Sequence, residues 1–228
     1  MTTAHRLARA TVALAVACTL ACSDSTGVET GTISVTMQQS DAALVQIVDG
    51  WYASVTGTQI SLDPDTVALL TVTVTELEFL VGASGDGITD NTSWTGFELP
   101  TPVTIDLMTL PTEGESPLVI AAGSVPVGDY RHVRLYVSDV TIEFTGPIEI
   151  GQAQNFAADT PYDVEIPSVE QTGITTDITF TVLADDLGEP TDVFLLFSPD
   201  ATMANVTANG LGNVMLTPVI NASVGSGS

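Results

Sequence analysis

The sequence predicts an all-β protein built as a single antiparallel β-sandwich. Apolar and polar residues alternate with a period of two in many segments, which is typical of half-buried strands. Glycine and proline turns separate these segments, and no long amphipathic helix follows the first 21 residues. About 200 residues are enough for one sizeable core, and no linker divides them, so we expect one domain.

The first 21 residues have the pattern of a signal peptide. His5, Arg6 and Arg9 form a basic start, and residues 10–21 are an unbroken small and apolar run. This run is shorter than the roughly 20 apolar residues that span a bilayer as a helix. We therefore expect residues 1–21 to be a helical export signal that is removed from the mature protein.

Two cysteines, Cys18 and Cys22, lie at the end of the apolar run. Residues 19–22 (Thr-Leu-Ala-Cys) resemble a lipobox, in which the cysteine receives diacylglycerol, although threonine stands where Leu or Val is usual. Cys18 is the alternative lipidation site. The polar chain that begins at Ser23 favours Cys22, and a serine at this position resembles outer-membrane sorting. The prediction is a cell-envelope lipoprotein anchored in a membrane, periplasmic or surface-facing.

The predicted domain boundaries follow from composition. Residues 22–30 are small and polar and suit a flexible tether, residues 31–222 form the sandwich, and the glycine and serine tail at 223–228 is expected to be disordered. Residues 41–48 remain open between a short helix and irregular chain, and residues 146–160 are a long connection. Strands are expected at 33–37, 51–62, 67–81 with a bulge near Thr75, 94–99, 103–107, 118–122, 130–144, 162–166, 174–183, 193–197 and 214–220.

The charge of the mature chain is strongly negative. All 28 acidic residues follow Cys22, against only Arg131 and Arg134 and no lysine, which gives a net charge of about −26. Such a field repels phosphate backbones, so we expect no nucleic-acid partner. The acidity has two interpretations, a solvated surface suited to a salty exterior or a surface that binds cations.

A series of short motifs follows one another in a characteristic order along the chain. They are 31–35, 70–79, 105–107 with Leu110, 127–130, 133–135, 166–168 with Gly173 and Ile174, 197–203 and 216–220. Together these motifs resemble a bacterial lipoprotein family, the domain of unknown function DUF4382. The resemblance covers nearly all of residues 31–220 and implies an envelope location and an immunoglobulin or transthyretin-like sandwich, but no established activity. The stretch between Gln38 and Asp65 is longer than in the family.

No catalytic apparatus is recognisable in the sequence. His132 is the only histidine after the leader, and it lies inside a predicted strand rather than where a serine could approach it. There is no Gly-x-Ser-x-Gly elbow, and a lipidated Cys22 cannot act as a nucleophile. We therefore expect a protein that is not an enzyme.

Calcium is the one cofactor that the composition suggests, because acidic loops supply the oxygen ligands that it prefers. No loop has the spacing of an EF-hand, so ordinary turn residues are the alternative interpretation, and no cofactor is firmly expected. Three loops hold the candidate ligands: Asp63 with Asp65, Asp86 with Asp90 and Asn91, and Asp185 with Asp186 and Glu189.

The basic residues Arg131, His132 and Arg134 form a second candidate site. An arginine there could hold a carboxylate or a sugar acid. The alternative is that both arginines pair with nearby carboxylates such as Asp129 or Asp139. Trp51 and Trp94 could stack on a sugar ring if they are exposed.

The sequence thus favours a non-catalytic surface module that binds an envelope protein or a glycan, or that has a structural role. The alternatives are a metal-dependent, calcium-using hydrolase and a calcium-stabilised structural subunit that uses the acidic loops.

Overall fold

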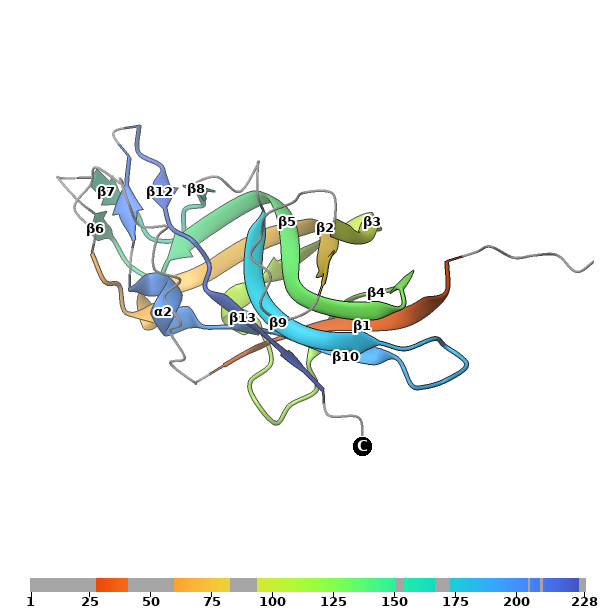
Figure 1. The fold of residues 1–228 in the computed structure, drawn as a ribbon. Helices are drawn as coiled ribbons and strands as arrows, with labels where there is room; N and C mark the ends of the chain where they lie inside the picture. Colours follow the sequence, from red (N-terminus) through yellow and green to blue (C-terminus); the bar gives the residue numbers. More distant parts are fainter. Residues whose placement is uncertain are drawn as a thin grey trace, which may run out of the picture.

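The computed structural model describes most of the chain beyond the tether, and it is nearly all β (Figure 1). None of the described helices is long and apolar enough to cross a membrane. The described residues are 28–40, 60–82, 94–150, 154–166, 173–204, 206–209 and 211–225. The expected signal peptide, the lipobox, residues 41–48 and Trp51 therefore lie outside them.

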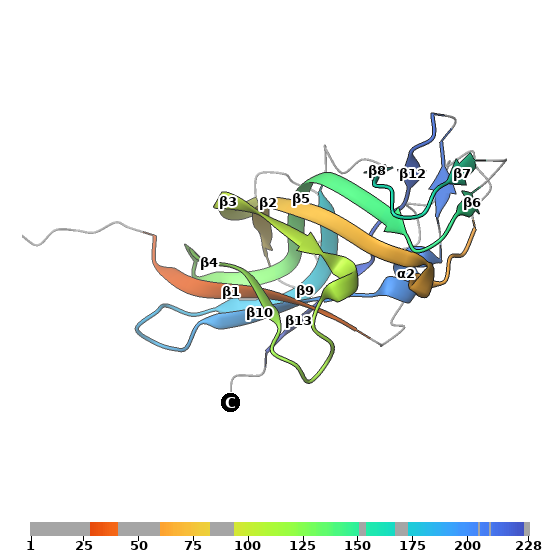
Figure 2. The ribbon, with the colours of Figure 1, turned by 180° about the vertical axis from the view of Figure 1, so that it is seen from behind.

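Two sheets form a sandwich-like arrangement that is not closed (Figures 1 and 2). The four-stranded sheet has the order β13-β10-β1-β4, with β1 Thr30–Gln39, β4 Leu118–Pro126, β10 Thr191–Phe197 and β13 Ile220–Val224. The seven-stranded sheet has the order β11-β12-β8-β5-β2-β3, and β9 pairs with β5 beside β8. Its strands are β2 Val67–Val81, β3 Trp94–Asp106, β5 Gly128–Phe144, β8 Tyr162–Glu165, β9 Ile174–Val182, β11 Thr207–Ala208 and β12 Val214–Met215.

The prediction that the sheets are purely antiparallel was wrong. Strands β1 and β10 pair in parallel from Ile33 with Thr191 to Gln39 with Phe197, and β8 pairs in parallel with β12. Parallel neighbours need a long crossover connection rather than a hairpin. Here the connection between β1 and β10 runs through the other sheet, and local turn chemistry does not encode such a pairing.

Several strand boundaries also differ from the sequence prediction. The two strands expected at 94–99 and 103–107 are one strand, β3, which contains Pro100 and Pro102. Proline lacks the N–H that a central strand donates, but β3 is an edge strand and tolerates it. The strand expected at 214–220 is divided between β12 and β13. Strand β13 continues to Val224, two residues into the expected tail, and pairs there with β10.

Short elements occupy the connections. The connection at 146–160 contains a hairpin of β6 Ile148–Ile150 and β7 Gln154–Phe156. A helix that the sequence analysis missed, α2 Pro199–Met203, begins with Ser198 as its N-cap and proline at its first position. The remaining elements are two 3₁₀ turns, η1 Pro64–Thr66 and η3 Leu107–Thr109.

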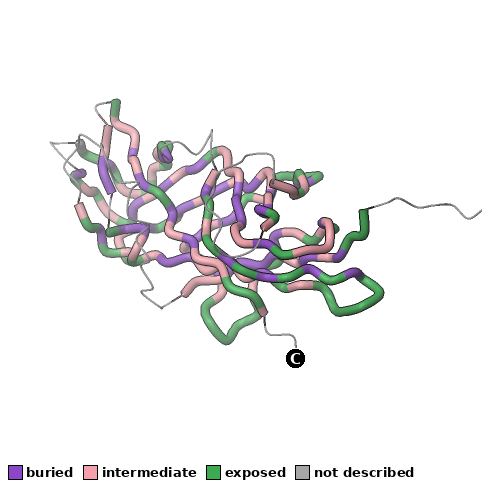
Figure 3. Tube along the Cα trace, in the orientation of Figure 1, coloured by how far each residue is buried: buried purple, intermediate pink, exposed green. Residues whose placement is uncertain are grey.

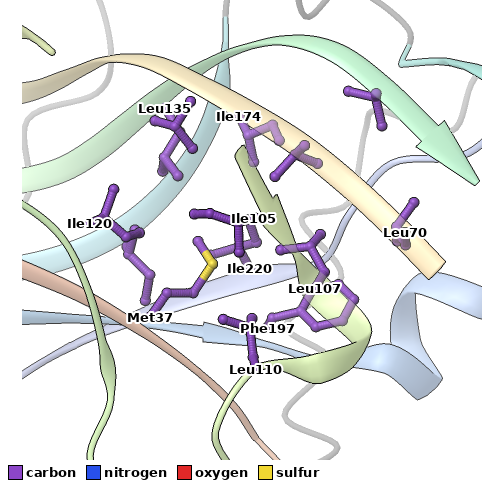
Figure 4. Close-up of a cluster of buried hydrophobic side chains, with 14 of the residues drawn as sticks. Met37, Leu70, Ile105, Leu107, Leu110, Ile120, Leu135, Ile174, Phe197 and Ile220 are labelled. Carbon is purple, nitrogen blue, oxygen red and sulfur yellow. The ribbon is translucent and has the colours of Figure 1, made fainter. Parts of the chain in front are cut away.

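The core lies between the two sheets and draws apolar side chains from both (Figures 3 and 4). Met37 and Phe197 come from the four-stranded sheet, and Leu70, Leu135 and Ile174 come from the seven-stranded sheet. The expected bulge near Thr75 is confirmed, because the register of β2 shifts between Val74 and Glu76 against both of its neighbours. The shift keeps Val74 and Leu77 both in the core.

Tyr130 links the start of β5 to the end of β4 through a hydrogen bond of its side chain. Its ring is fully buried and stacks on Phe180, with the ring centroids 5.2 Å apart. Its hydroxyl donates a hydrogen bond of 2.5 Å to the carbonyl oxygen of Pro126. Burial raises the pKa of Tyr130 to about 12, because the phenolate would lose its hydration.

We predict that Tyr130→Phe lowers the free energy of unfolding by about 1–2 kcal/mol, because the partly buried carbonyl of Pro126 loses its partner. The native state also keeps this phenol protonated to about pH 12, whereas an unfolded tyrosine ionises near pH 10. The stabilisation is therefore complete below about pH 10 and is lost as the pH rises through about 12. Urea unfolding from pH 7 to 12 measures both effects.

Tyr162→Phe is the matched control, because the hydroxyl of Tyr162 accepts a hydrogen bond from the Ala157 amide in an exposed position. Water can replace that hydroxyl, so the loss of stability is smaller. Equal losses from the two substitutions would contradict the role given to Tyr130.

Candidate functional site

The candidate site lies on the face of the seven-stranded sheet that points away from the core. Side chains alternate between the two faces of a strand, so Phe79 lies in the core while Glu78 and Leu80 lie on the opposite face. The register places Leu80 beside Trp94 of β3 and His132 of β5. We use the name outer-face cluster for six residues of this face: Glu78, Leu80, Trp94, His132, Arg134 and Tyr136.

Leu80 is fully buried although it lies on the outer side of the sheet. Strands β3 and β5 flank β2, so their backbones are about 10 Å apart at this point. The ring centroids of Trp94 and His132 are only 6.5 Å apart. The two rings therefore lean towards each other over Leu80, and this covering explains its burial.

Arg134 is the centre of the cluster and is only 8 % exposed. Its guanidinium carbon lies 3.7 Å from the centroid of the Trp94 ring, a close cation–π contact. Its Nη1 donates to the Glu78 carboxylate at 3.4 Å and to the Tyr136 hydroxyl at 3.2 Å, and its Nε donates to the Thr175 hydroxyl at 3.4 Å. The buried charge is thus paired, stacked and hydrogen-bonded, as a charge removed from water must be.

Gly173 packs directly over the aliphatic part of Arg134. A Cβ at this position would lie 2.8 Å from Cγ of Arg134, and the backbone has a φ of +62°. Glycine meets both requirements, since it has no side chain and adopts positive φ without strain. The arginine is therefore held between the start of β9 and the indole of Trp94.

His132 is fixed from the other side of the cluster. Its Nδ1 lies 2.7 Å from the carboxylate of Asp177 on β9, and its side chain is 13 % exposed. Within the described residues the imidazole contacts a carboxylate and an indole rather than a serine hydroxyl. This arrangement orients the ring and does not present a nucleophile.

Carboxylates gather at one margin of the cluster. Glu76 lies opposite both Glu98 and Tyr136 in the register. Burial raises the pKa of Glu76, and the neighbouring charges of Glu78 and Glu98 raise it further. The guanidinium of Arg134 is paired with Glu78, so this margin of the sheet is acidic.

The structure changes the interpretation of the basic residues. Asp129 and Asp139 were the expected partners of the arginines, but Arg134 pairs with Glu78. Glu78 lies on β2, two residues beyond the register shift between Val74 and Glu76. The local sequence does not reveal this pairing because it joins two strands. Instead, Asp129 accepts a hydrogen bond from the hydroxyl of Thr181.

Arg131 lies in a bulge of β5. The register of β5 shifts between Tyr130 and His132 against β9, so Tyr130 and Val133 both face the core although they are three residues apart. The guanidinium of Arg131 lies beside Gly82, within 3.6 Å of the position a Cβ would occupy. Arg131 is therefore not a member of the outer-face cluster.

Two of the acidic loops are described, and their aspartates act in backbone turns. Asp63 caps η1, where its carboxylate accepts from the Asp65 amide at 3.0 Å. Asp185 accepts from the Thr32 amide at 2.7 Å and so ties the β9–β10 loop to β1. Asp186 and Glu189 are exposed in the same loop.

Asp86, Asp90 and Asn91 lie outside the described residues. Across the part of the chain that the structure describes, no group of three or more Asp, Glu, His or Cys side chains is arranged to hold a metal ion. The structure thus brings together Trp94, His132 and Arg134 of the predicted site residues, and among the described candidate calcium ligands it shows no such group.

The sequence analysis missed four residues of the site. Glu78 and Tyr136 belong to the outer-face cluster, and Thr175 and Asp177 contact its members Arg134 and His132. Alternation already places Tyr136 on the same face as Arg134. The other contacts depend on which residues pair across three strands, and alternation fixes only the face of each residue, not its partner.

The described residues thus form a sandwich-like all-β domain that carries a preformed aromatic and charged cluster on one sheet. Residues 30–218 match the model of a family described as a domain of unknown function, DUF4382. The chain belongs to this family, as its motifs predicted. No curated protein and no solved structure matches the chain.

We predict that Arg134 and Glu78 stabilise the fold jointly. Glu78→Gln should cost about 1–2 kcal/mol, because it leaves a largely buried guanidinium without its charged partner. Arg134→Met should cost more, since it also removes the contact with Trp94. In a double-mutant cycle measured by urea unfolding, the two substitutions should show a coupling of about 1 kcal/mol.

Glu98→Gln is the control for loss of a carboxylate on the same face. The substitution removes a negative charge that repels Glu76. Glu98 forms no ion pair among the described contacts, so the free energy of unfolding should change little or rise. A coupling near zero between Arg134 and Glu78, or an equal loss from Glu98→Gln, would contradict this assignment.

Proposed function

We propose that this protein is a lipid-anchored component of the bacterial cell envelope, attached through Cys22 to the outer membrane. Its sandwich is a non-catalytic module that binds an envelope glycan or an envelope protein. The signal-peptide pattern, the lipobox-like residues before Cys22 and the membership of DUF4382 support the anchoring.

The outer-face cluster is the observation that carries the binding role. Trp94 and Tyr136 are half-buried aromatic side chains, and Arg134 holds them together through a stack and a hydrogen bond. Aromatic rings that are already fixed lose little conformational entropy when a ligand packs on them. Carboxylates beside the rings, such as Glu76 and Glu98, can accept hydrogen bonds from the hydroxyl groups of a sugar.

The same reasoning favours a glycan or a polar protein surface over an apolar ligand. The cluster lies on a sheet face and is bordered by charged groups, whereas sites for small apolar ligands are concave and mostly apolar. An open hollow of about 360 Å³ lies elsewhere, lined in part by Gln39, Pro64 and Met108. No described contact links that hollow to the outer-face cluster.

The finer fold assignment is also part of the proposal. We assign the sandwich to the immunoglobulin or transthyretin-like kind, supported by the hydrogen bond from Tyr130 back to Pro126. A buried tyrosine that bonds to the backbone a few residues upstream is the arrangement of a tyrosine corner in such sandwiches.

We predict that the wild-type protein, expressed in a Gram-negative host, stays in the membrane fraction and carries a lipid mass on its N-terminal peptide. Cys22→Ala should release the protein or leave its leader uncleaved, because the modified cysteine supplies the acyl chains. Fractionation and mass spectrometry of the N-terminal peptide measure both. Cys18→Ala is the matched control and should stay lipidated; the opposite pattern would move the anchor to Cys18.

We predict that a photo-crosslinking amino acid in place of Tyr136, in the lipidated full chain, captures one polysaccharide or one protein from the native envelope. A probe in place of Val119, an exposed residue of β4 on the other sheet, is the matched control and should not capture it. Trp94→Ala should remove the adduct, because Trp94 supports the neighbouring cluster. Equal adducts from both probes, or none from the probe at position 136, would overturn the binding role of this face.

A further inference from the structure

Two exposed leucines project from the loop that joins β9 to β10. Leu183 is 55 % exposed and Leu187 is 70 % exposed, so this loop presents two large apolar side chains four residues apart to solvent. The loop is an ordered turn, since the Leu187 amide donates to the Ala184 carbonyl at 2.8 Å and Ala184 is buried. Its leucines are therefore presented at fixed positions and lose little freedom on binding.

This loop lies against the first residues of the domain. The Thr32 amide donates to Asp185 at 2.7 Å. A Cβ at Gly31 would lie 1.9 Å from the carbonyl oxygen of Leu183, so only glycine permits this close approach. Figures 1 and 2 show the loop projecting from the end of the sandwich at which β1 begins.

The chain that precedes β1 is short. Thr30 follows Cys22 by eight residues, which span at most about 28 Å when fully extended and about 16 Å on average as a flexible coil. The exposed Val28, 73 % accessible, lies in this approach. A lipid attached at Cys22 therefore keeps the bilayer surface within reach of Leu183 and Leu187 at all times.

We propose that the β9–β10 loop docks on the lipid surface and inserts Leu183 and Leu187 into the bilayer interface. This inference rests on the proposed lipid anchor at Cys22. Because the anchor already holds the protein at the bilayer, the contact between the loop and the lipid surface is intramolecular and has a high effective concentration. Two apolar side chains are then enough to hold the domain in one orientation on the membrane.

Charge selects the kind of lipid surface. Asp186 and Glu189 flank Leu187 and are exposed, so they stay at the level of the headgroups. An anionic surface repels them, and a zwitterionic surface does not. The loop therefore fits phosphatidylcholine or phosphatidylethanolamine headgroups, with the leucines buried about 5–10 Å into the interface as for other interfacial segments.

The test uses the lipidated full chain in phosphatidylcholine vesicles, with a bimane fluorophore attached to a Leu187→Cys variant. The sulfur of a lipidated Cys22 is blocked, so the label reacts at position 187 alone. Lipids that carry a doxyl quencher near the headgroup should quench this label several-fold more than a label on Leu211→Cys. Leu211 is the matched control, because it is 87 % exposed in the β11–β12 turn at the far end of the sandwich.

Two further measurements extend this test. Replacing part of the phosphatidylcholine by phosphatidylglycerol should reduce the quenching at position 187, because Asp186 and Glu189 are repelled. Leu183→Ser in the labelled variant should reduce it as well, while Val119→Ser should not.

The outcomes separate this inference from the anchor on which it rests. The intact mass of the same sample shows whether Cys22 carries lipid, and its absence would overturn the anchor and the docking together. With the lipid present, equal quenching at positions 187 and 211 would overturn the docking alone. A label that is shielded from aqueous iodide but not quenched by doxyl lipids would also overturn it, because another protein surface would then cover the loop.

Discussion

The pairing of β2 with β5 is the interaction on which the rest of this structure depends. These two long strands pair from Val67 with Phe144 to Val81 with Tyr130. One face of the pair supplies Phe79 and Leu135 to the core, and the opposite face supplies the outer-face cluster. A shift of one residue would exchange the two faces and place carboxylates in the core, so the apolar pattern fixes the register strongly.

The scarcity of positive charge gives this pairing a second importance. The described part of the chain holds two arginines, and both lie on β5. Arg134 is fixed by Glu78, Trp94 and Tyr136, which leaves most carboxylates of the surface to solvent and counterions. At 0.1 M, salt largely screens the repulsion between exposed charges that are more than about 10 Å apart, so an acidic surface of this kind suits an ionic solution.

The sequence predicted the elements that depend on local chemistry and missed those that depend on distant contacts. The bulge at Thr75 follows from a change of facing within one strand, and the Asp63 turn follows from aspartate beside proline. The parallel pairing of β1 with β10 and the continuation of β3 through Pro100 could not be predicted, because both depend on where a strand lies in its sheet.

The same division explains the candidate site. His132, Arg134 and Tyr136 are two residues apart along β5, so alternation alone puts them on one face of the sheet. The stack of Arg134 on Trp94 spans three strands, and the Asp177 partner comes from a fourth, so both require the register. The acidic loops illustrate the converse, because Asp63 caps a turn and Asp185 accepts from the Thr32 amide of β1, and composition alone does not distinguish these roles from metal binding.

The position of the two arginines has a consequence for proteolysis. Proteases of the trypsin type cleave only after lysine or arginine, and after Cys22 this chain offers them only Arg131 and Arg134. Both bonds lie inside β5, which is hydrogen-bonded on both sides to β2 and β9. Cleavage needs an extended, locally unfolded segment, so these bonds become available only when the centre of the sheet opens. The rate of cleavage by this class of protease therefore reports how often β5 opens.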